Sequence, residues 1–437
     1  MKTKPNQKKE IRKLFNEMNS KTDFLNLLNY TKSLIYGVKT FPFTEKQLNF
    51  YINIDRIQKS KSVETYKTFE IKKKSGKKRI IHSPCKGLKE FQKCLNIILS
   101  TIYKPHTSAH GFVIGKSIVD NAKNHVTKNY VYNIDLKDFF PSIDSNRVWG
   151  RLTVKPFNLG TTESRKQIAN MIKSICCTPM KVERHIEGAW ITKTLSVLPQ
   201  GAATSPVLTN AICERLDIQL TGLSKRFGLD YSRYADDITF SSMHNTYTTD
   251  NGKQETIYKK DNTFDKELRR IISTQNFYIN EEKVRLQKRG YKQEVTGLIV
   301  NKKVNTPSHY IKEIRQWIYF IESKGYDKAY ELFLKKYIKN KGEIGNSKPS
   351  MLLVIEGKLL YLKMVKGDTN ATYLKLKSRF DELAQCTPSK LEYNLEDDET
   401  VLNVEEKETI YNRDINVIID AIFNEGLEKA MNLYKAK

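Results

Sequence analysis

Two adjacent carboxylates set between apolar residues constrain this chain more than any other feature. They lie in Tyr234-Ala235-Asp236-Asp237, between the turn residues Gly228 to Asp230 and the pair Ser241-Ser242. Apolar and aromatic residues flank the acids, so the segment predicts a tight β-hairpin with the acids at its tip. Neighbouring carboxylates raise one another's pKa, and Mg²⁺, which prefers carboxylate and phosphate oxygens, relieves that repulsion. Taken alone, the pair is also compatible with an ordinary surface turn.

A second acidic segment lies upstream. The stretch Asn133 to Phe140 follows the β-rich run Tyr130 to Tyr132, which places Asp135 at the end of a predicted strand and Asp138 where the chain leaves it. With the Asp-Asp pair, Asp135 supplies the three carboxylates that two-metal phosphoryl transfer requires. One metal lowers the pKa of an attacking hydroxyl, and the other stabilises the leaving pyrophosphate. By itself, Asp135 would fit a strand-end cap or an ion pair.

A loop punctuated by proline and glycine separates the two acidic segments. It runs from Leu198 to Pro206 and continues into a predicted helix, Val207 to Leu216. Gly201 lets a flat ligand approach the backbone closely, and Gln200 donates and accepts hydrogen bonds without carrying charge. An ordinary loop and helix start would have a similar composition.

In this order, the motifs resemble those of reverse transcriptases: Asp135-Leu-Lys-Asp-Phe-Phe, then Leu198-Pro-Gln-Gly, then Tyr234-Ala-Asp-Asp. The resemblance extends from about residue 65 to about residue 385. It implies an α+β, right-hand polymerase fold with fingers, palm and helical thumb, and two bound Mg²⁺ ions. The residues it assigns to catalysis and to the metals are Asp135, Asp236 and Asp237.

The same resemblance assigns a nucleotide pocket. Gln200 and Gly201 would line it, and Phe140 would block a ribose 2′-OH and so favour deoxynucleotides. Phe139 and Phe140 could instead be core residues, and we expect that one of the two is.

Basic residues elsewhere are expected to contact the triphosphate. The segment Phe69 to Ile81 predicts a hairpin with a basic Ser-Gly turn, similar to the fingers hairpin of the family. Arg79 and either Lys72 or Lys73 would bind the phosphates, Arg through a planar fork and Lys as a point charge. Lys283 matches a family lysine near the pyrophosphate and could act as a general acid. A solvated lysine-rich face is the alternative for the hairpin, and a plain surface lysine for Lys283.

Two further segments resemble the signature of bacterial retron reverse transcriptases. They are Asn121-Ala-Lys-Asn-His125, on a predicted helix, and Val295-Thr-Gly297, before a predicted strand that leads into the thumb. His125 could equally be a packed, hydrogen-bonded histidine. The RNA and primer contacts expected in these segments and on the first thumb helix are Asn121, His125, Val295, Thr296, Gly297, Lys312 and Arg315.

Composition agrees with a polymerase without identifying one. The 437 residues carry a formal net charge of +26, which is typical of a nucleic-acid-binding protein. The six cysteines include no C-x-x-C pair and no His at zinc spacing, which argues against redox or zinc chemistry. Neither a signal peptide nor an apolar run of about 18 residues is evident, so we expect a cytoplasmic protein without a membrane partner.

The chain is predicted to have five parts. They are a helical N-terminal extension (1–64), fingers (65–125), a palm (126–302), a helical thumb (303–385) and an acidic helical tail (386–437). The palm has two insertions, Thr178 to Thr194 and His244 to Asn262, of which the second is polar and a predicted surface loop. Trp317 in the thumb would either stack on bases or pack in a core. The tail has twelve acidic and six basic residues, so it would dock on the basic body or on a partner protein.

These resemblances together favour a retron-type RNA-directed DNA polymerase. They imply dNTP substrates, a structured non-coding RNA as primer and template, an RNA–DNA hybrid and a branched, RNA-linked single-stranded DNA (msDNA). They also imply a separate effector protein and a role in antiphage defence. The alternatives are a group II intron or diversity-generating enzyme, an abortive-infection polymerase that works without template, and an RNA-binding scaffold with an inactive palm.

Overall fold

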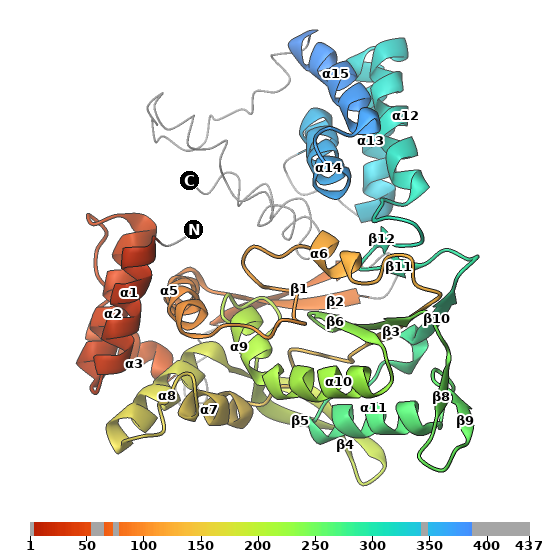
Figure 1. Cartoon of the computed structure of the whole chain (residues 1–437). Coiled ribbons are helices and arrows are strands. Elements are labelled where there is room, and N and C mark those ends of the chain that lie inside the picture. The colour runs from red at the N-terminus through yellow and green to blue at the C-terminus, as the bar shows by residue number, and fades with distance from the viewer. Residues whose placement is uncertain (1–3, 54–64, 73–77, 342–347, 387–437) are drawn as a thin grey trace. The chain divides into compact units, whose positions relative to one another are not determined.

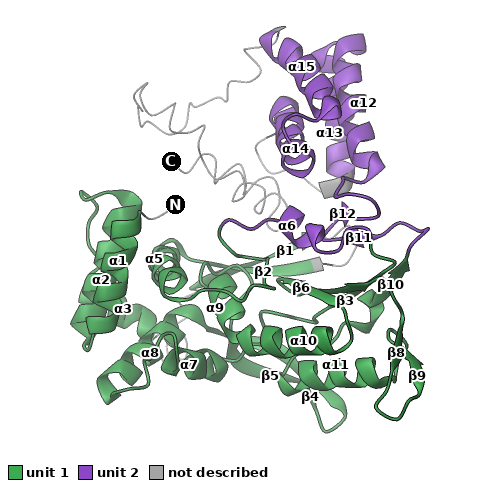
Figure 2. Cartoon of the chain, in the orientation of Figure 1, with its two compact units in different colours: residues 1–114, 128–288 green, residues 115–127, 289–437 purple. Residues whose placement is uncertain are grey.

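The computed structural model describes residues 4–53, 65–72, 78–341 and 348–386. Helices and strands are mixed along these residues (Figure 1), which confirms the predicted α+β class. Contacts divide the chain into two compact units (Figure 2). Unit 1 contains Met1–Ile114 and Lys128–Lys288, and unit 2 contains Gly115–Thr127 and Arg289–Lys437. The predictions for Lys73 and for the tail from residue 387 onward lie outside the described residues.

Unit 1 contains a four-stranded antiparallel sheet. In spatial order its strands are β10 (Arg285–Lys288), β3 (Tyr130–Asp135), β7 (Asp237–Ser242) and β6 (Asp230–Tyr234). β6 and β7 pair as the predicted hairpin, and β3 ends at Asp135 as predicted. Aromatic and β-branched residues suit such a pleated, half-buried surface. Those buried in β3 and β7 include Val131, Ile134, Ile238 and Phe240.

Three helices of unit 1 support this sheet. α10 (Glu214–Arg226) packs on β6, and α11 (Thr263–Thr274) packs beside α10 (Figure 1). α9 (Ser205–Ile212) precedes α10, and Pro206 lies in its first turn, where the missing N–H has no helical partner to lose. The single helix predicted from Val207 to Leu216 is divided in the structure into two helices, which meet at Cys213.

The remaining elements of unit 1 include the predicted N-terminal helices and the predicted fingers hairpin β1–β2. They are α1 (Pro5–Glu17), α2 (Lys21–Tyr36), α3 (Glu45–Ile52), β1 (Tyr66–Lys72), β2 (Lys78–Pro84), α5 (Lys86–Ile102), α7 (Ser145–Thr153), α8 (Glu163–Cys176), β4 (Thr178–Ile186), β5 (Ala189–Val197), β8 (Thr246–Thr248), β9 (Gln254–Thr256) and the 3₁₀ helix η1 (Glu281–Lys283). The insertion predicted as a surface loop contains the hairpin β8–β9. The next residues, Ile257 and Tyr258, are buried and anchor it to the body.

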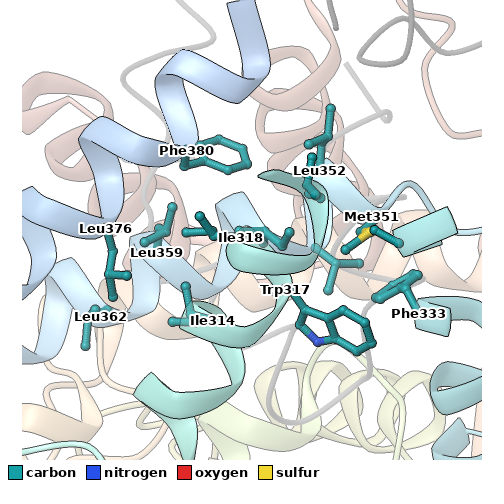
Figure 3. Packing of buried hydrophobic residues seen from close by; sticks show 14 of the residues in the cluster. Ile314, Trp317, Ile318, Phe333, Met351, Leu352, Leu359, Leu362, Leu376 and Phe380 are labelled. Atoms are coloured by element: carbon teal, nitrogen blue, oxygen red, sulfur yellow. The ribbon is translucent and has the colours of Figure 1, made fainter. Parts of the chain in front are cut away.

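Unit 2 combines a short hairpin with a helical bundle. Its elements are α6 (Ile118–Lys123), β11 (Glu294–Val295), β12 (Leu298–Ile299), α12 (Ser308–Lys324), α13 (Tyr326–Lys341), α14 (Met351–Lys366) and α15 (Ala371–Cys386). Ile314 and Ile318 of α12 point into an apolar cluster with Leu352 and Phe380 (Figure 3). Trp317 belongs to the same cluster and is 4% exposed, so it packs in the core rather than stacking on bases.

None of the helices in the described ranges has the length and apolar composition that a membrane crossing needs. The five cysteines whose side chains are described are all free thiols.

Candidate active site

Strand register brings the two acidic segments together. Asp135, the last residue of β3, is paired across the sheet with Asp237, the first residue of β7. The last residue pair of the β6–β7 hairpin is Tyr234 with Asp237, so Ala235 and Asp236 form a two-residue turn. Ala235 has a φ of 56°, which a residue with a Cβ adopts only at a cost. The sheet thus places the three predicted catalytic aspartates at one end of its two inner strands, where they form an acidic cluster.

Lys283 and Asn280 hold Asp135. The Lys283 ammonium lies 2.8 Å from each Asp135 carboxylate oxygen. The Asn280 side-chain amide donates to Oδ1 at 3.0 Å, and its backbone N–H donates to the Asp135 carbonyl at 2.8 Å. Lys283, selected from the sequence, therefore lies at the acidic cluster, whereas sequence reasoning missed Asn280.

The acidic cluster shifts the pKa of both members of the Asp-Asp pair. Desolvation, followed by repulsion from Asp135, raises the pKa of Asp236. Desolvation, followed by repulsion from Asp236 and Asp135, raises the pKa of Asp237 to about 7. The Asp237 residue is exposed although its carboxyl is crowded, so solvent screens part of this repulsion. Lys283 opposes both shifts and Arg79 opposes that of Asp236, so these cations lie close enough to act on the cluster.

The donor atoms fit a divalent cation, because hard carboxylate oxygens and a shortage of positive charge favour such an ion. The side chains are not yet gathered around one point. No three His, Cys, Asp or Glu side chains in the described part of the chain converge on a common metal position. Both carboxylate oxygens of Asp135 face the Lys283 ammonium. A bound cation would therefore compete with Lys283 for Asp135.

We expect Mg²⁺ to raise the Tm of the protein more at pH 8 than at pH 6. Below about pH 7 a proton on Asp237 competes with the metal. Without Mg²⁺, the stability of the protein should instead fall as the pH rises. A raised folded-state pKa gives stability below the ordinary value of 3.8, and that stability is lost as the pH rises towards 7. Thermal unfolding with and without Mg²⁺ at both pH values measures this. An equal Mg²⁺ effect at both pH values would contradict it, and Asp237→Asn should remove the difference.

Arg233 fixes the turn that carries the acids. This wholly buried side chain donates to both carboxylate oxygens of Asp217 on α10, at 2.8 and 2.6 Å. Its third nitrogen donates to the Ala235 carbonyl at 3.0 Å, and Tyr231 donates to the same Asp217 at 2.7 Å. Sequence reasoning missed this network. The sequence feature that pointed to it is Asp217, an acidic residue on the buried apolar face of α10 that also carries Leu220.

The segment from Ser108 to Gly111 also packs against this turn. The backbone N–H groups of His110 and Arg233 donate to Arg233 and Ser108 carbonyls, each at 2.8 Å. A Cβ on Gly111 would lie 2.4 Å from the Ala235 nitrogen, so only glycine permits this approach.

Gln200 and Gly201 adjoin the β1–β2 hairpin. The Gln200 carbonyl accepts from the His82 N–H of β2 at 2.8 Å. Gly201 has a φ of 130°, and a Cβ there would lie 2.5 Å from the His82 carbonyl oxygen. These contacts join the loop between the two acidic segments to β2, the strand that contains Arg79.

Gly201→Ala is expected to lower the free energy of unfolding by about 1–3 kcal/mol, because the new Cβ meets backbone and the φ value excludes it. Gly222→Ala in α10 is the control. It has open space and an ordinary φ, so it should stabilise by about 0.5–1 kcal/mol. Denaturant titration measures both. A Gly201→Ala protein that unfolds at the wild-type denaturant concentration would contradict the expectation.

Phe139 and Phe140 differ in burial, as expected. Phe139 is 4% exposed and contacts Phe277, whereas Phe140 is half-buried and contacts Phe112 at a ring distance of 5.9 Å. Among the phosphate-contact candidates, Arg79 is half-buried near Asp236. For Lys72 the structure describes the backbone as the end of β1, and its side chain lies outside the described residues.

The β4–β5 hairpin braces the site from outside, a role the sequence did not indicate. Lys137, two residues after Asp135, pairs with Glu183 at 2.9 Å and lies 3.8 Å from the Trp190 ring centre. Trp190 packs edge-on against Tyr278, whose carbonyl accepts from the Lys137 N–H at 2.8 Å. The hairpin thus connects the loop after Asp135 with the loop before Lys283.

In unit 2 the predicted RNA contacts fall into two groups. Asn121, His125 and Val295 are 1%, 0% and 0% exposed, and His125 lies just beyond the end of α6. Side chains this deeply buried are not available for direct contact with RNA in this structure. Lys312 and Arg315 are exposed on α12.

Thr296 and Gly297 form the turn of the β11–β12 hairpin, with φ values of 46° and 80°. Two positive values are typical of the tight type I′ turn, and they are costly for a β-branched threonine. The Thr296 hydroxyl donates to the Ile118 carbonyl at 3.4 Å, which joins the hairpin to α6. Both retron-like segments therefore meet within unit 2, and their RNA contacts remain a prediction.

Three aspartates close together with cations nearby suit two-metal phosphoryl transfer, the chemistry that polymerases use. The family model described as "Reverse transcriptase (RNA-dependent DNA polymerase)" matches residues 71–303, more than half of the chain. The chain belongs to the reverse transcriptase family and, within it, to the bacterial retron type.

Two curated relatives illustrate the similarity. "Retron Mx65 reverse transcriptase" of Myxococcus xanthus is 36% identical over 239 residues, which cover 55% of this chain and 52% of that protein. "Retron Ec86 reverse transcriptase" of Escherichia coli is 32% identical over 260 residues, which cover 59% of this chain and 70% of that protein. The chain thus spans about half the length of the Myxococcus relative.

Solved telomerase structures are also similar to this chain. That of Candida albicans, in complex with a telomeric RNA fragment, is 11% identical with a TM-score of 0.36, covering 85% of this chain and 63% of that one. That of Candida tropicalis, also with telomeric RNA, is 13% identical with a TM-score of 0.36, covering 90% and 72%.

Proposed function

We propose that this protein is an RNA-directed DNA polymerase that extends a primer 3′-OH, or an RNA 2′-OH at initiation, with dNTPs. The observation that carries the proposal is the register that sets Asp135 beside Asp237, with Asp236 in the adjoining turn and Lys283 bonded to Asp135. In the reaction the primer oxygen attacks the α-phosphorus, the bond to the β-phosphate breaks, and pyrophosphate leaves.

The three aspartates would hold two Mg²⁺ ions. When bound, these would neutralise the carboxylates, favour deprotonation of the primer hydroxyl and stabilise charge on the pyrophosphate. Arg79 would bind the triphosphate, and Lys283, released from Asp135, would give a proton to the leaving pyrophosphate. Phe140, half-buried beside Phe112, would exclude a ribose 2′-OH.

The proposed template and primer is one structured non-coding RNA, and the proposed product is branched, RNA-linked single-stranded DNA. The retron relatives and the two retron-like segments that meet in unit 2 support this substrate. The exposed Lys312 and Arg315 on α12 would bind the RNA backbone through charge. A separate effector protein and a role in antiphage defence complete the proposal, and these rest on the retron type alone.

The test is to express the gene with its flanking DNA and analyse total nucleic acid on a denaturing gel, with and without RNase and debranching enzyme. A discrete DNA that shortens on debranching and is missing from Asp236→Ala/Asp237→Ala cells is the expected result.

The other outcomes separate the alternatives. A heterogeneous product would favour a group II intron or diversity-generating enzyme. Incorporation by the purified protein without added RNA would favour the template-independent, abortive-infection type. Phage protection that persists in the double variant would favour an RNA-binding scaffold.

A further inference from the structure

A pocket of unit 1 lies between α7, α9 and α10 and takes no part in the proposed reaction. Its volume is about 360 Å³, within the range of pockets that hold small ligands. Arg147 and Arg151 of α7 and Arg215 of α10 line it together with one acid, Glu214. None of these residues belongs to the acidic cluster or to the nucleotide-pocket candidates described above.

Two of the three arginines present donors that the protein does not satisfy. Nη2 of Arg147 donates to the Gln275 carbonyl at 2.7 Å, but its Nη1 is buried without a partner. Arg151 pairs with Glu214 and with the Lys155 carbonyl, but its Nε is likewise buried without a partner. Buried donors are almost always hydrogen-bonded in proteins, so two guanidinium groups beside the pocket have unused donor capacity.

The acceptor that the pocket favours is an anion. Glu214 already pairs with Arg151, which leaves Arg147 and Arg215 without a neutralising acid among the lining side chains. Arginine's planar fork matches phosphate oxygens. Ile212 and Val154, which is 52% exposed, add apolar surface to the lining. Phosphate next to a flat, apolar-faced group is the chemistry of a nucleotide.

We propose that this pocket binds the phosphate of a nucleotide, either a free nucleotide or one unit of a polynucleotide strand, at a site separate from the active site. Arg147 would also connect the pocket with the active-site side of unit 1, because its guanidinium lies 4.7 Å from the ring centre of Phe277, which packs on Phe139.

The test titrates the protein with dAMP and with a single-stranded DNA oligonucleotide by calorimetry, in excess EDTA to remove metal-dependent nucleotide binding at the active site. Arg215→Glu should weaken binding at least about tenfold, since a phosphate contact is replaced by repulsion. Arg215 is exposed, so folding should persist. Val154→Trp, which fills the pocket without changing charge, should weaken binding as much.

Lys225→Glu is the matched control, because it makes the same charge change at an exposed position of the same helix outside the pocket. Asp236→Asn should also bind normally, which separates this proposal from the proposed polymerase function. Binding of dAMP that depends on Arg215 but not on Lys225 indicates a free nucleotide. The same dependence for the oligonucleotide alone indicates a strand. Equal effects of Arg215→Glu and Lys225→Glu, or no saturable binding of either probe, would overturn the proposal and leave a pocket filled by water.

Discussion

Asp236→Asn is expected to lower nucleotide incorporation at least about a thousandfold, a loss of about 4 kcal/mol of transition-state stabilisation. Asparagine keeps the size of the side chain and so preserves the turn with Ala235, but it removes a charge that the metals need. The same change should slightly raise the Tm of the metal-free protein. Burial and Asp135 raise the pKa of Asp236, so its ionised form is unfavourable when no cation is present.

Single-nucleotide extension of an annealed primer measures the activity, and thermal unfolding in EDTA measures the stability. Asp230→Asn is the matched control at the other end of the same hairpin, where the carboxylate faces Lys128 and is half exposed. It should change neither quantity much, since surface ion pairs contribute at most about 1 kcal/mol. A protein that retains synthesis after Asp236→Asn would refute the proposed metal site.

Local sequence pattern was sufficient for the elements that carry the acids. The ends of β3 and β7, the turn at Ala235 and the pairing of β1 with β2 follow from apolar stretches bounded by turn residues, and the structure confirms these elements. The division of Phe139 from Phe140, one buried and one half-buried, was also expected. Each of these features depends on residues within a few positions of one another.

Contacts between distant segments were not predictable in the same way. The pairing of Lys283 with Asp135 spans 148 residues, and that of Lys137 with Glu183 spans 46. The sequence singled out Lys283 only through family resemblance. It gave no partner for Asp217, because hydrophobic periodicity locates a buried helix face but does not show which strand covers it. The bracing hairpin β4–β5 was seen only as an insertion of mixed composition.

The buried pair Arg233–Asp217 provides the second large effect. Arg233→Met is expected to lower the free energy of unfolding by about 3–5 kcal/mol, because it leaves Asp217 charged, buried and without its cation. Although burial alone would lower the pKa of Arg233, Asp217 holds it well above its usual value, so Arg233 stays ionised in the folded protein. Denaturant unfolding measures the loss. Arg270→Met, which breaks the exposed pair with Glu267, is the control and should cost at most about 1 kcal/mol.

The double variant Arg233→Met/Asp217→Leu separates stability from positioning. Replacing both partners of a buried ion pair by apolar residues is often nearly neutral, so much of the lost stability should return. Activity should not return, because the Ala235 carbonyl has lost the donor that fixes the turn beside Asp236. Primer extension by the refolded double variant measures this. If activity and stability recover together, Arg233 serves the fold alone. If Arg233→Met costs less than about 1 kcal/mol, the pair does not hold β6 to α10 as its burial and geometry require.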